Sequence, residues 1–311
     1  MKVFVPGHLG LVGSSVVRNA PESVEIVTKT RAELDITNSK KLTEFFKKEK
    51  FDGLILCAAR VGGIGANSKF QKDFLLENLQ IQNAVIPAAA NSGIENLVFL
   101  GSACIYPKIT QQPIVESALL EGPLEPSNEG YALAKIAGVR LVKAIHDEEG
   151  LNYVSLMPTN LYGPNDNFDM FSSHVAAALI RKFHEAKSTG KPEVTVWGSG
   201  KPTREFMHVD DMASACWFML NQNVGGQLFN VGTGIEITIK DYAALLANIT
   251  GFKGSILFDS SKPDGTPRRV LDVSRINALG WKASINLEEG LVETYSWFME
   301  ALLKGDVRGI K

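Results

Sequence analysis

The side chains with the clearest chemistry are a tyrosine and a lysine four residues apart, Tyr131 and Lys135. On a helix, residues four apart lie on one face, one turn apart. An ammonium group beside a phenol favours the phenolate, so the pair predicts a tyrosine pKa lowered from about 10 toward the working range of an acid catalyst. Ser102 precedes this pair and has a hydroxyl that can hydrogen-bond a substrate carbonyl. The three residues predict a site in which Tyr131 gives a proton to a carbonyl that receives a hydride, while Lys135 holds the nicotinamide ribose.

Two further residues indicate proton removal from carbon. Cys104 lies two residues after Ser102, and His174 opens a predicted helix. A thiol with an ordinary pKa near 8.5 can remove a proton next to a ketone, and imidazole changes charge near neutrality. A reductase alone needs neither group. The alternative is structural for both residues, a buried cysteine and a histidine at the start of a helix.

A glycine-rich segment follows the first apolar run, with the sequence Gly7-His8-Leu9-Gly10-Leu11-Val12-Gly13. The first glycine permits a tight turn, the second lets the backbone approach a pyrophosphate, and the third lets the helix pack on the sheet. The helix N-terminus then presents free N–H groups to the anion. We expect this loop to bind a dinucleotide, the alternative being a glycine-rich turn without a ligand.

The residues after the second predicted strand favour NADP(H) over NAD. An Asp or Glu there would bond the ribose 2′-hydroxyl of NAD, but this chain has Thr28-Lys29-Thr30-Arg31. Arg31 can bind a 2′-phosphate with two hydrogen bonds. Glu33 and Asp35 are close enough to weaken this preference. We expect Asp35 either to contact adenine or to cap the helix that begins near Ser39.

The first half of the chain has a pattern of strands and helices that can position these residues. Strands are expected at 3–5, 24–28, 54–57, 97–100 and 154–157, and helices at 11–18, 39–50, 69–91 and 128–149. This alternation predicts an α/β fold with a Rossmann-type doubly wound parallel sheet. Ligands bind beyond the carboxyl ends of the strands in such sheets, which is where the glycine loop and Ser102 fall.

The pattern changes after Pro158, where residues 162–169 are rich in turn formers and predict a loop. Beyond it we expect a helix at 173–187, a strand at 194–196, main-sheet strands at 206–209 and 228–231, and helices at 240–250 and 287–303. Residues 1–163 are therefore expected to form an NADP-binding domain to which 206–234 return. Residues 164–205 and 235–311 are expected to form a smaller C-terminal α/β substrate lobe.

Composition excludes several other classes of protein. The chain has 311 residues and a net charge of −2, which gives no general reason to bind nucleic acid or a membrane surface. No apolar run approaches the roughly 18 residues of a membrane span, and residues 1–7 do not resemble a signal peptide. The three cysteines, Cys57, Cys104 and Cys216, form no zinc-binding pattern. We expect no metal and a reduced, cytoplasmic setting.

Longer strings resemble the GDP-L-fucose synthase family of extended short-chain dehydrogenase/reductases. They cover 102–108, 158–168, 173–175, 196–200, 204–211, 262–267 and 271–273, and so extend over nearly the whole chain. The resemblance implies conversion of GDP-4-keto-6-deoxy-D-mannose to GDP-L-fucose. Cys104 and His174 are then the base and acid of epimerisation at C3 and C5. NADPH reduces C4, with Tyr131 as proton donor and Ser102 steadying the oxyanion.

The resemblance also implies binding residues. Contacts to the nucleotide-sugar are implied for Lys182, Trp197, Arg204 and Asp272, and contacts to the cofactor for Leu100, Gly101, Ser102, Lys135, Pro158, Thr159, Asn160, Leu161 and His174 in addition to the glycine loop and Arg31. Arg and Lys suit a diphosphate, and Trp offers a face for packing. A solvated helix face is the alternative for Lys182. In the string 208–211 we expect a carboxylate to cap the following helix.

The sequence departs from the family pattern at two positions. Leu9 stands where the family often has Arg, so we expect weaker discrimination against NAD. Lys182 stands where some relatives carry Arg, which keeps the charge but not the bidentate geometry. By analogy, the helices at 69–91 and 128–149 are expected to pair in a homodimer. The alternatives are another nucleotide-sugar epimerase or reductase, in which Cys104 and His174 are inert, and a non-catalytic NADP-sensing regulator. An intact Ser102, Tyr131 and Lys135 argue against the regulator.

Overall fold

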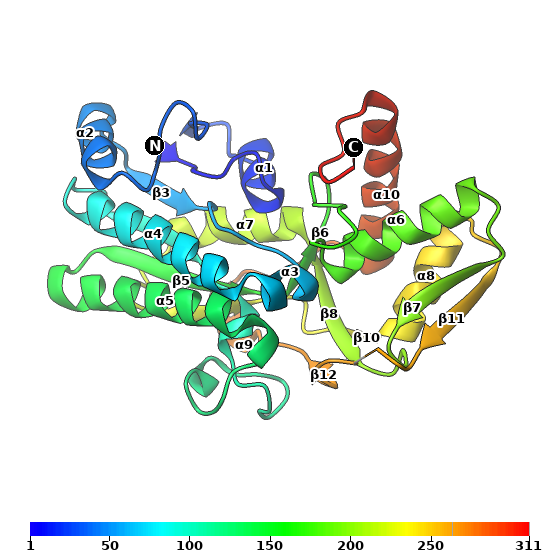
Figure 1. Ribbon diagram of the computed structural model, residues 1–311. Coiled ribbons are helices and arrows are strands. Elements are labelled where there is room, and N and C mark those ends of the chain that lie inside the picture. Colours follow the sequence, from blue (N-terminus) through cyan, green and yellow to red (C-terminus); the bar gives the residue numbers. More distant parts are fainter. Residues whose placement is uncertain (263, 311) are drawn as a thin grey trace.

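A six-stranded parallel sheet forms the centre of the larger lobe in the computed structural model, which describes residues 1–262 and 264–310 (Figure 1). The strand order is β2-β1-β3-β4-β5-β9, with bounds β1 Lys2–Phe4, β2 Glu25–Val27, β3 Gly53–Leu56, β4 Asn96–Leu100, β5 Asn152–Pro158 and β9 Leu228–Val231. The order reverses between β1 and β3, which makes the switch point where such sheets bind ligands. Pro263, part of one of the strings above, lies outside the described residues.

Helices cover both faces of this sheet. On one face lie α2 (Ser39–Glu49), α4 (Gln71–Ala90) and α5 (Glu129–Glu149), and on the other α1 (Leu11–Arg18) and α7 (Val209–Leu220). Successive residues of a strand point to opposite faces of the sheet and so belong to different hydrophobic cores. Phe4, Leu54 and Leu97 pack in the core beneath α2, α4 and α5. Val3, Ile55 and Val98 pack in the core beneath α1 and α7. This alternation follows from the two-residue period of a strand. Both faces are buried, so the strands are nearly continuous apolar runs. The predicted fold class is confirmed.

The long helix expected at 69–91 is α4, and a short helix α3 (Ile64–Lys69) precedes it. Phe70 separates the two with a backbone outside the helical region. Likewise, α5 starts at Glu129 after a single 3-10 turn at Pro126–Asn128. Both breaks lie beside the pocket described below, because α3 contacts that 3-10 turn.

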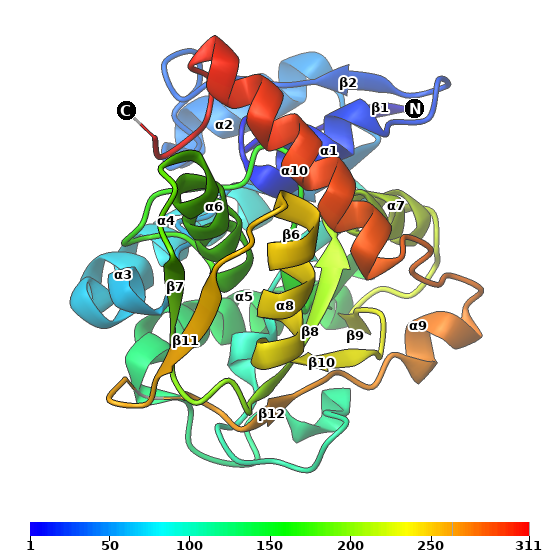
Figure 2. The same cartoon turned by 90° about the vertical axis from the view of Figure 1, so that its right-hand side faces the viewer.

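A second lobe carries its own small sheets. Strands β6 (Asn160–Tyr162), β8 (Thr203–His208), β10 (Glu236–Thr238) and β12 (Arg268–Arg269) form one, and β7 (Glu193–Trp197) pairs with β11 (Ser255–Asp259). Helices α6 (Val175–Ser188), α8 (Ile239–Thr250) and α10 (Leu287–Lys304) pack around them, as Figure 2 shows. The prediction that 206–209 joins the main sheet is wrong, because β8 pairs with β6 and β10. An apolar run indicates a buried strand but not its partner.

The chain passes between the two lobes at Thr159, which lies between the end of β5 and the start of β6. Its amide still donates to Val231 of the main sheet (3.0 Å), while its hydroxyl donates to the backbone oxygen of Glu205 on β8 (3.2 Å). The carboxylate of Glu205 is buried and accepts from the amides of Thr233 (2.6 Å), Gly234 (2.8 Å) and Leu271 (2.8 Å). One carboxylate therefore joins β8 to the segments after β9 and β12.

The start of α7 differs from expectation. His208, rather than a carboxylate, caps the helix, because its Nδ1 accepts from the amide of Asp210 (3.3 Å). Asp210 instead accepts from Ser15 on α1 (2.6 Å), and Asp211 accepts from the amides of Ser284 and Ile285 (both 3.0 Å). The two carboxylates tie α7 to its neighbours. In residues 1–262 and 264–310, every helix is too short or too polar to cross a membrane.

Candidate active site

The glycine loop lies at the switch point of the main sheet. Gly7 has a positive φ of 89°, and a Cβ there would approach the amide nitrogen of Ala58, just past β3, to 2.6 Å. A Cβ on Gly13 would collide with the carbonyl of Gly7. Gly10 donates to that same carbonyl (3.0 Å) and is the N-cap of α1. The loop therefore requires glycine where the sequence has it, and α1 presents its first N–H groups beside the crevice.

The segment after β4 positions Ser102 and Cys104. The Ser102 hydroxyl accepts from the amide of Cys104 (3.2 Å) and starts a 3-10 turn at Ala103–Ile105. Arg269 of β12 donates to the carbonyls of Ala103 (3.1 Å) and Tyr106 (3.2 Å). A side chain of the second lobe thus fixes the loop that carries two predicted catalytic residues. Sequence reasoning missed Arg269, since no local pattern connects it to a loop about 165 residues earlier.

Tyr131 and Lys135 lie buried on the first turns of α5. The Lys135 ammonium donates to the carbonyl of Leu100 (2.7 Å) and lies 5.8 Å from the centre of the Tyr131 ring. Burial lowers the pKa of Lys135 to about 8. Burial also raises the pKa of Tyr131, and the nearby Ser102 hydroxyl only partly opposes this. The expected lowering is wrong for this structure, because the phenolate loses hydration in an apolar pocket.

Cys104 shares that pocket. Its side chain packs against a cluster formed by Ala66, Phe74 and Tyr131. The side-chain amide of Asn128, at the start of α5, donates to the Cys104 sulfur (3.2 Å). The structure therefore brings Ser102, Cys104, Tyr131 and Lys135 together and adds Asn128, which sequence reasoning missed.

His174 approaches from the second lobe, immediately before α6. The residues before it meet the loop after β3, where Gly63 donates to the carbonyl of Ser172 (2.8 Å). Burial lowers the pKa of His174, and the charge of Arg308 acts in the same direction. Among the described residues, the hydrogen bonds do not join its ring to Cys104. The pairing of these two groups as base and acid stays a prediction.

Three of the four residues expected to bind the nucleotide-sugar lie on the second lobe: Lys182 and Trp197 are neighbours, and Arg204 lies beside Arg269. The Lys182 ammonium lies 5.6 Å from the centre of the Trp197 ring, which is 62% exposed. Arg204 stands opposite Arg269 in the parallel register of β8 and β12. Burial and the charge of Arg269 lower the pKa of Arg204, as expected where two cations converge. Such a pair of guanidinium groups can bind a diphosphate.

Asp272, the fourth of these residues, makes hydrogen bonds within its own segment. Its carboxylate accepts from the amide (2.9 Å) and the hydroxyl of Ser274, at the start of α9 (Ser274–Ala278). Asp35 likewise accepts from the amide (3.0 Å) and hydroxyl (2.7 Å) of Thr37, while Asn38 caps α2. Capping by Asp35, one of its two expected roles, is therefore wrong. Arg31 is exposed after β2, and its charge contributes to lowering the pKa of Asp35.

The remaining residues expected to contact the cofactor lie at or just after the carboxyl ends of β4 and β5. Leu100 ends β4, and Pro158 ends β5 beside β9. The side chain of Asn160 donates to the carbonyl of Glu205 (2.8 Å), so its amide orientation is set by the second lobe. Leu9 is 69% exposed, whereas the Nδ1 atom of His8 is buried.

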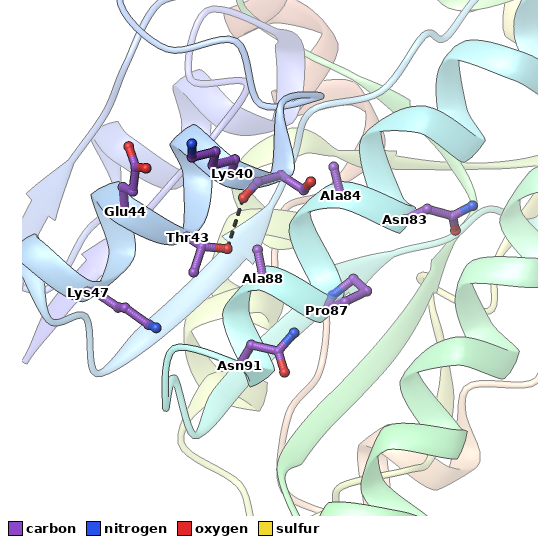
Figure 3. Close-up of a pocket in the computed structure, with 10 residues that line it drawn as sticks. Lys40, Thr43, Glu44, Lys47, Asn83, Ala84, Pro87, Ala88 and Asn91 are labelled. Atoms are coloured by element: carbon purple, nitrogen blue, oxygen red, sulfur yellow. Dashed lines mark hydrogen bonds between the residues drawn. The ribbon is translucent and has the colours of Figure 1, made fainter.

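A separate depression lies on the outside of the larger lobe. Figure 3 shows it between α2 and α4, with a volume of about 400 Å³ and with Lys40 and Lys47 on one side and Asn83 and Asn91 on the other. The residues lining it include none of those expected to act in chemistry or binding. The chemistry expected from the sequence therefore lies away from this depression.

Comparison with known proteins agrees with this geometry. Residues 3–232 match the model of the NAD dependent epimerase/dehydratase family. The chain belongs to this family. A protein of Arabidopsis thaliana named putative GDP-L-fucose synthase 2 is 51% identical over 97% of this chain and 93% of its own length. The GDP-L-fucose synthase of Escherichia coli K12 is 48% identical over 96% of this chain and 97% of its own.

A solved structure has the same overall fold as this chain. The GDP-L-fucose synthetase of Naegleria fowleri bound to NADP superposes with a TM-score of 0.88 at 27% identity, covering 98% of this chain and 96% of that one. The match includes the second lobe, which extends beyond the 3–232 segment of the family model.

Proposed function

We propose that the chain acts as a GDP-L-fucose synthase, an NADP-dependent epimerase and reductase that converts GDP-4-keto-6-deoxy-D-mannose to GDP-L-fucose. The observation that carries this proposal is the position of the Cys104 thiol against Tyr131, in one pocket with Ser102 and Lys135. A reductase needs the acid but not the thiol. The relatives that bear the same name are similar to this chain over nearly its whole length.

The residues present fit a dinucleotide, because the glycine loop places backbone where side chains would collide and α1 presents its N-terminus there. NADPH supplies the hydride to C4 when bound. We assign the rest of the reduction to the chain's own groups. Ser102 and Tyr131 hydrogen-bond the C4 oxygen, and Tyr131 gives it a proton, since burial keeps the phenol protonated at neutral pH. Lys135 stays fixed by the carbonyl of Leu100 and faces the ribose.

The same oxygen-binding groups serve the epimerisations. Removal of a proton at C3 or C5 places negative charge on the C4 oxygen, which Ser102 and Tyr131 stabilise. The Cys104 sulfur takes the proton, and Asn128 orients that sulfur by donating a hydrogen bond to it. A proton returns to the opposite face of the carbon from His174, whose lowered pKa makes its protonated form a ready donor.

The binding residues complete this assignment. The glycine loop, the segment 158–161 and Lys135 hold the cofactor, and Arg31 contacts the 2′-phosphate. Lys182, Trp197, Arg204 and Asp272 bind the GDP-sugar, with Arg204 at the diphosphate because Arg269 adds a second positive charge beside it. The same proposal divides the chain into a cofactor domain of 1–163 with 206–234 and a substrate lobe of 164–205 with 235–311, corrected so that strands β6 and β8 belong to the sheet of the second lobe.

Two properties of the whole protein belong with it. Homodimerisation through α4 and α5 is supported by their packing side by side on one face of the molecule, where Leu76 and Leu133 are exposed (Figure 1). A cytoplasmic setting is supported by the free thiols of Cys57, Cys104 and Cys216, since a reducing compartment keeps cysteines unpaired.

A paired isotope experiment tests the function. Wild type, Cys104→Ser and a control, Cys216→Ala, are incubated with GDP-4-keto-6-deoxy-D-mannose in deuterated water, with and without NADPH. Cys216 is buried behind the sheet, so the control removes a thiol away from the pocket. Wild type and control are expected to exchange the C3 and C5 protons without NADPH and to oxidise NADPH when it is added. Cys104→Ser is expected to lose the exchange, as followed by proton NMR.

Two results would contradict this assignment. Exchange at the wild-type rate in Cys104→Ser would remove the thiol from the mechanism. Neither exchange nor NADPH oxidation by wild type would exclude this substrate and leave only the family membership.

A further inference from the structure

The last residues of the described chain fold back onto the second lobe. Val307 is buried in the core of that lobe, and the carbonyl of Arg308 accepts from the amide of Phe168 (2.9 Å). Arg181 of α6 donates to the carbonyls of both Phe168 (2.9 Å) and Gly309 (3.3 Å). Figure 1 shows this tail (red) turning back from α10 to lie near β6 and α6. Backbone groups and Val307 therefore fix the tail, independently of the Arg308 side chain.

That side chain reaches the opposite end of the sequence. The Nη1 atom of Arg308 lies 4.0 Å from the position that a Cβ on Gly10 would occupy, so the guanidinium sits over the glycine loop. Asn165, in the segment that holds the tail, donates to Ser14 of α1 (3.2 Å). This hydrogen bond fixes the position of the tail's contact segment relative to α1 without involving Arg308.

Two sources of positive potential converge at this point. Gly10 is the N-cap of α1, whose macrodipole is positive at that end, and the guanidinium lies against it. Asp166 feels the charge of Arg308, but burial raises the pKa of Asp166 to about 7, so it offers incomplete compensation near neutrality. Leu9 brings no charge to the loop itself. An anion bound at the loop would satisfy both the N–H groups and the guanidinium.

We propose that Arg308 is a binding residue for the diphosphate of the dinucleotide cofactor, carried to the glycine loop by the C-terminal tail. The proposal rests on the proposed function for the identity of the cofactor, and it adds a residue that the glycine-loop pattern does not contain. Arg31 and Arg308 then bind different parts of NADPH. Arg31 meets the 2′-phosphate, which NADH lacks, whereas Arg308 meets the diphosphate, which both cofactors share.

The test compares affinities for NADPH, NADH and GDP by titration calorimetry on the full chain. Arg308→Gln is expected to weaken the binding of NADPH and of NADH by the same factor, about tenfold, as loss of a charge-assisted hydrogen bond predicts. Arg308→Lys keeps the charge without the bidentate geometry, and its affinities are expected to lie between those of wild type and Arg308→Gln. Arg31→Gln is expected to weaken the binding of NADPH more than that of NADH. Lys304→Gln, which removes an exposed charge at the end of α10, is the control and is expected to change neither.

Each other outcome overturns the inference. Unchanged or tighter dinucleotide binding by Arg308→Gln would mean that the guanidinium does not contact the diphosphate. Weakening confined to NADPH would assign it to the 2′-phosphate, and weakening confined to GDP would assign it to the nucleotide-sugar. A wild type that binds neither dinucleotide would defeat the proposed function and this inference together, whereas binding by wild type with no effect of Arg308→Gln defeats this inference alone. Unchanged thermal unfolding of Arg308→Gln and Arg308→Lys separates these results from misfolding.

Discussion

Burial sets the chemistry of the individual side chains in the pocket. It lowers the pKa of Lys135 to about 8 and raises that of Tyr131, so that the phenol is a protonated donor and the ammonium is held by the carbonyl of Leu100. A Tyr-x-x-x-Lys pattern predicts a lysine that acidifies the tyrosine. Loss of hydration sets the direction of the Tyr131 shift here, because the phenol lies in apolar surroundings.

The contact from Asn128 to Cys104 leads to a residue-scale prediction. Asn128→Ala removes the donor that orients the sulfur and is expected to slow exchange of the C3 and C5 protons about tenfold, the effect of losing one hydrogen bond. The control is Ser127→Ala, whose hydroxyl bonds Glu125 instead (3.3 Å). Wild-type exchange in Asn128→Ala would rule out this role.

Among the elements, β8 does most to hold the two lobes together. It lies in the second sheet, yet Glu205 at its centre accepts from the segment after β9 of the main sheet and from Leu271. Because β8 also carries Arg204, and β12 beside it carries Arg269, the same contacts place the two guanidinium groups at the crevice. A buried carboxylate is stable there because three backbone N–H groups satisfy it.

For this element we predict that replacing one carboxylate oxygen of Glu205 by an NH2 group strongly lowers the stability of the protein. Glu205→Gln places an NH2 group against the amide of Leu271 and is expected to lower the free energy of unfolding by about 2–3 kcal/mol, since a buried donor loses its acceptor. Glu236→Gln, on the neighbouring β10, breaks a partly exposed ion pair with Arg268 and is expected to cost about 1 kcal/mol or less. Urea denaturation measures both. Equal effects would contradict the role given to Glu205.

In the whole molecule, contacts between the lobes come from segments that are far apart in sequence. They include the crossing at Thr159, the carboxylate of Glu205, the contacts of Arg269 with the loop that carries Ser102, and the contact of Asn165 with Ser14. The two lobes therefore have their main connections where the cofactor and the sugar nucleotide are proposed to meet. The opposite side of the larger lobe, covered by α4 and α5, is left for association.

The proposed homodimer gives the prediction for the whole molecule. Leu133→Glu places a charge on the exposed side of α5 and is expected to convert a dimer into a monomer at micromolar concentration, as measured by sedimentation velocity. Leu303→Glu is the control, because Leu303 is 90% exposed at the end of α10, outside the proposed interface. Monomeric wild type, or a Leu133→Glu variant that still dimerises, would exclude this interface.

Much of this protein follows from local patterns in the sequence. The glycine spacing of residues 7–13 matches a loop in which side chains at Gly7 and Gly13 would collide with backbone. The helix at 11–18 and the main-sheet strand at 228–231 lie where the apolar periodicity predicts them. Such features depend on period, turn geometry and steric limits within a few residues, so the sequence alone determines them.

Other features were decided only by the tertiary structure. An apolar run does not indicate which sheet a strand joins. The run at 206–209 predicts a strand of the main sheet, whereas β8 lies in the sheet of the second lobe. The partners of Cys104, of the Ser102 loop and of Gly10 are Asn128, Arg269 and Arg308, which come from distant segments. The direction of the Tyr131 pKa shift depends on how much water the pocket excludes. Contacts and hydration arise from the packing of the whole chain, and no local spacing encodes them.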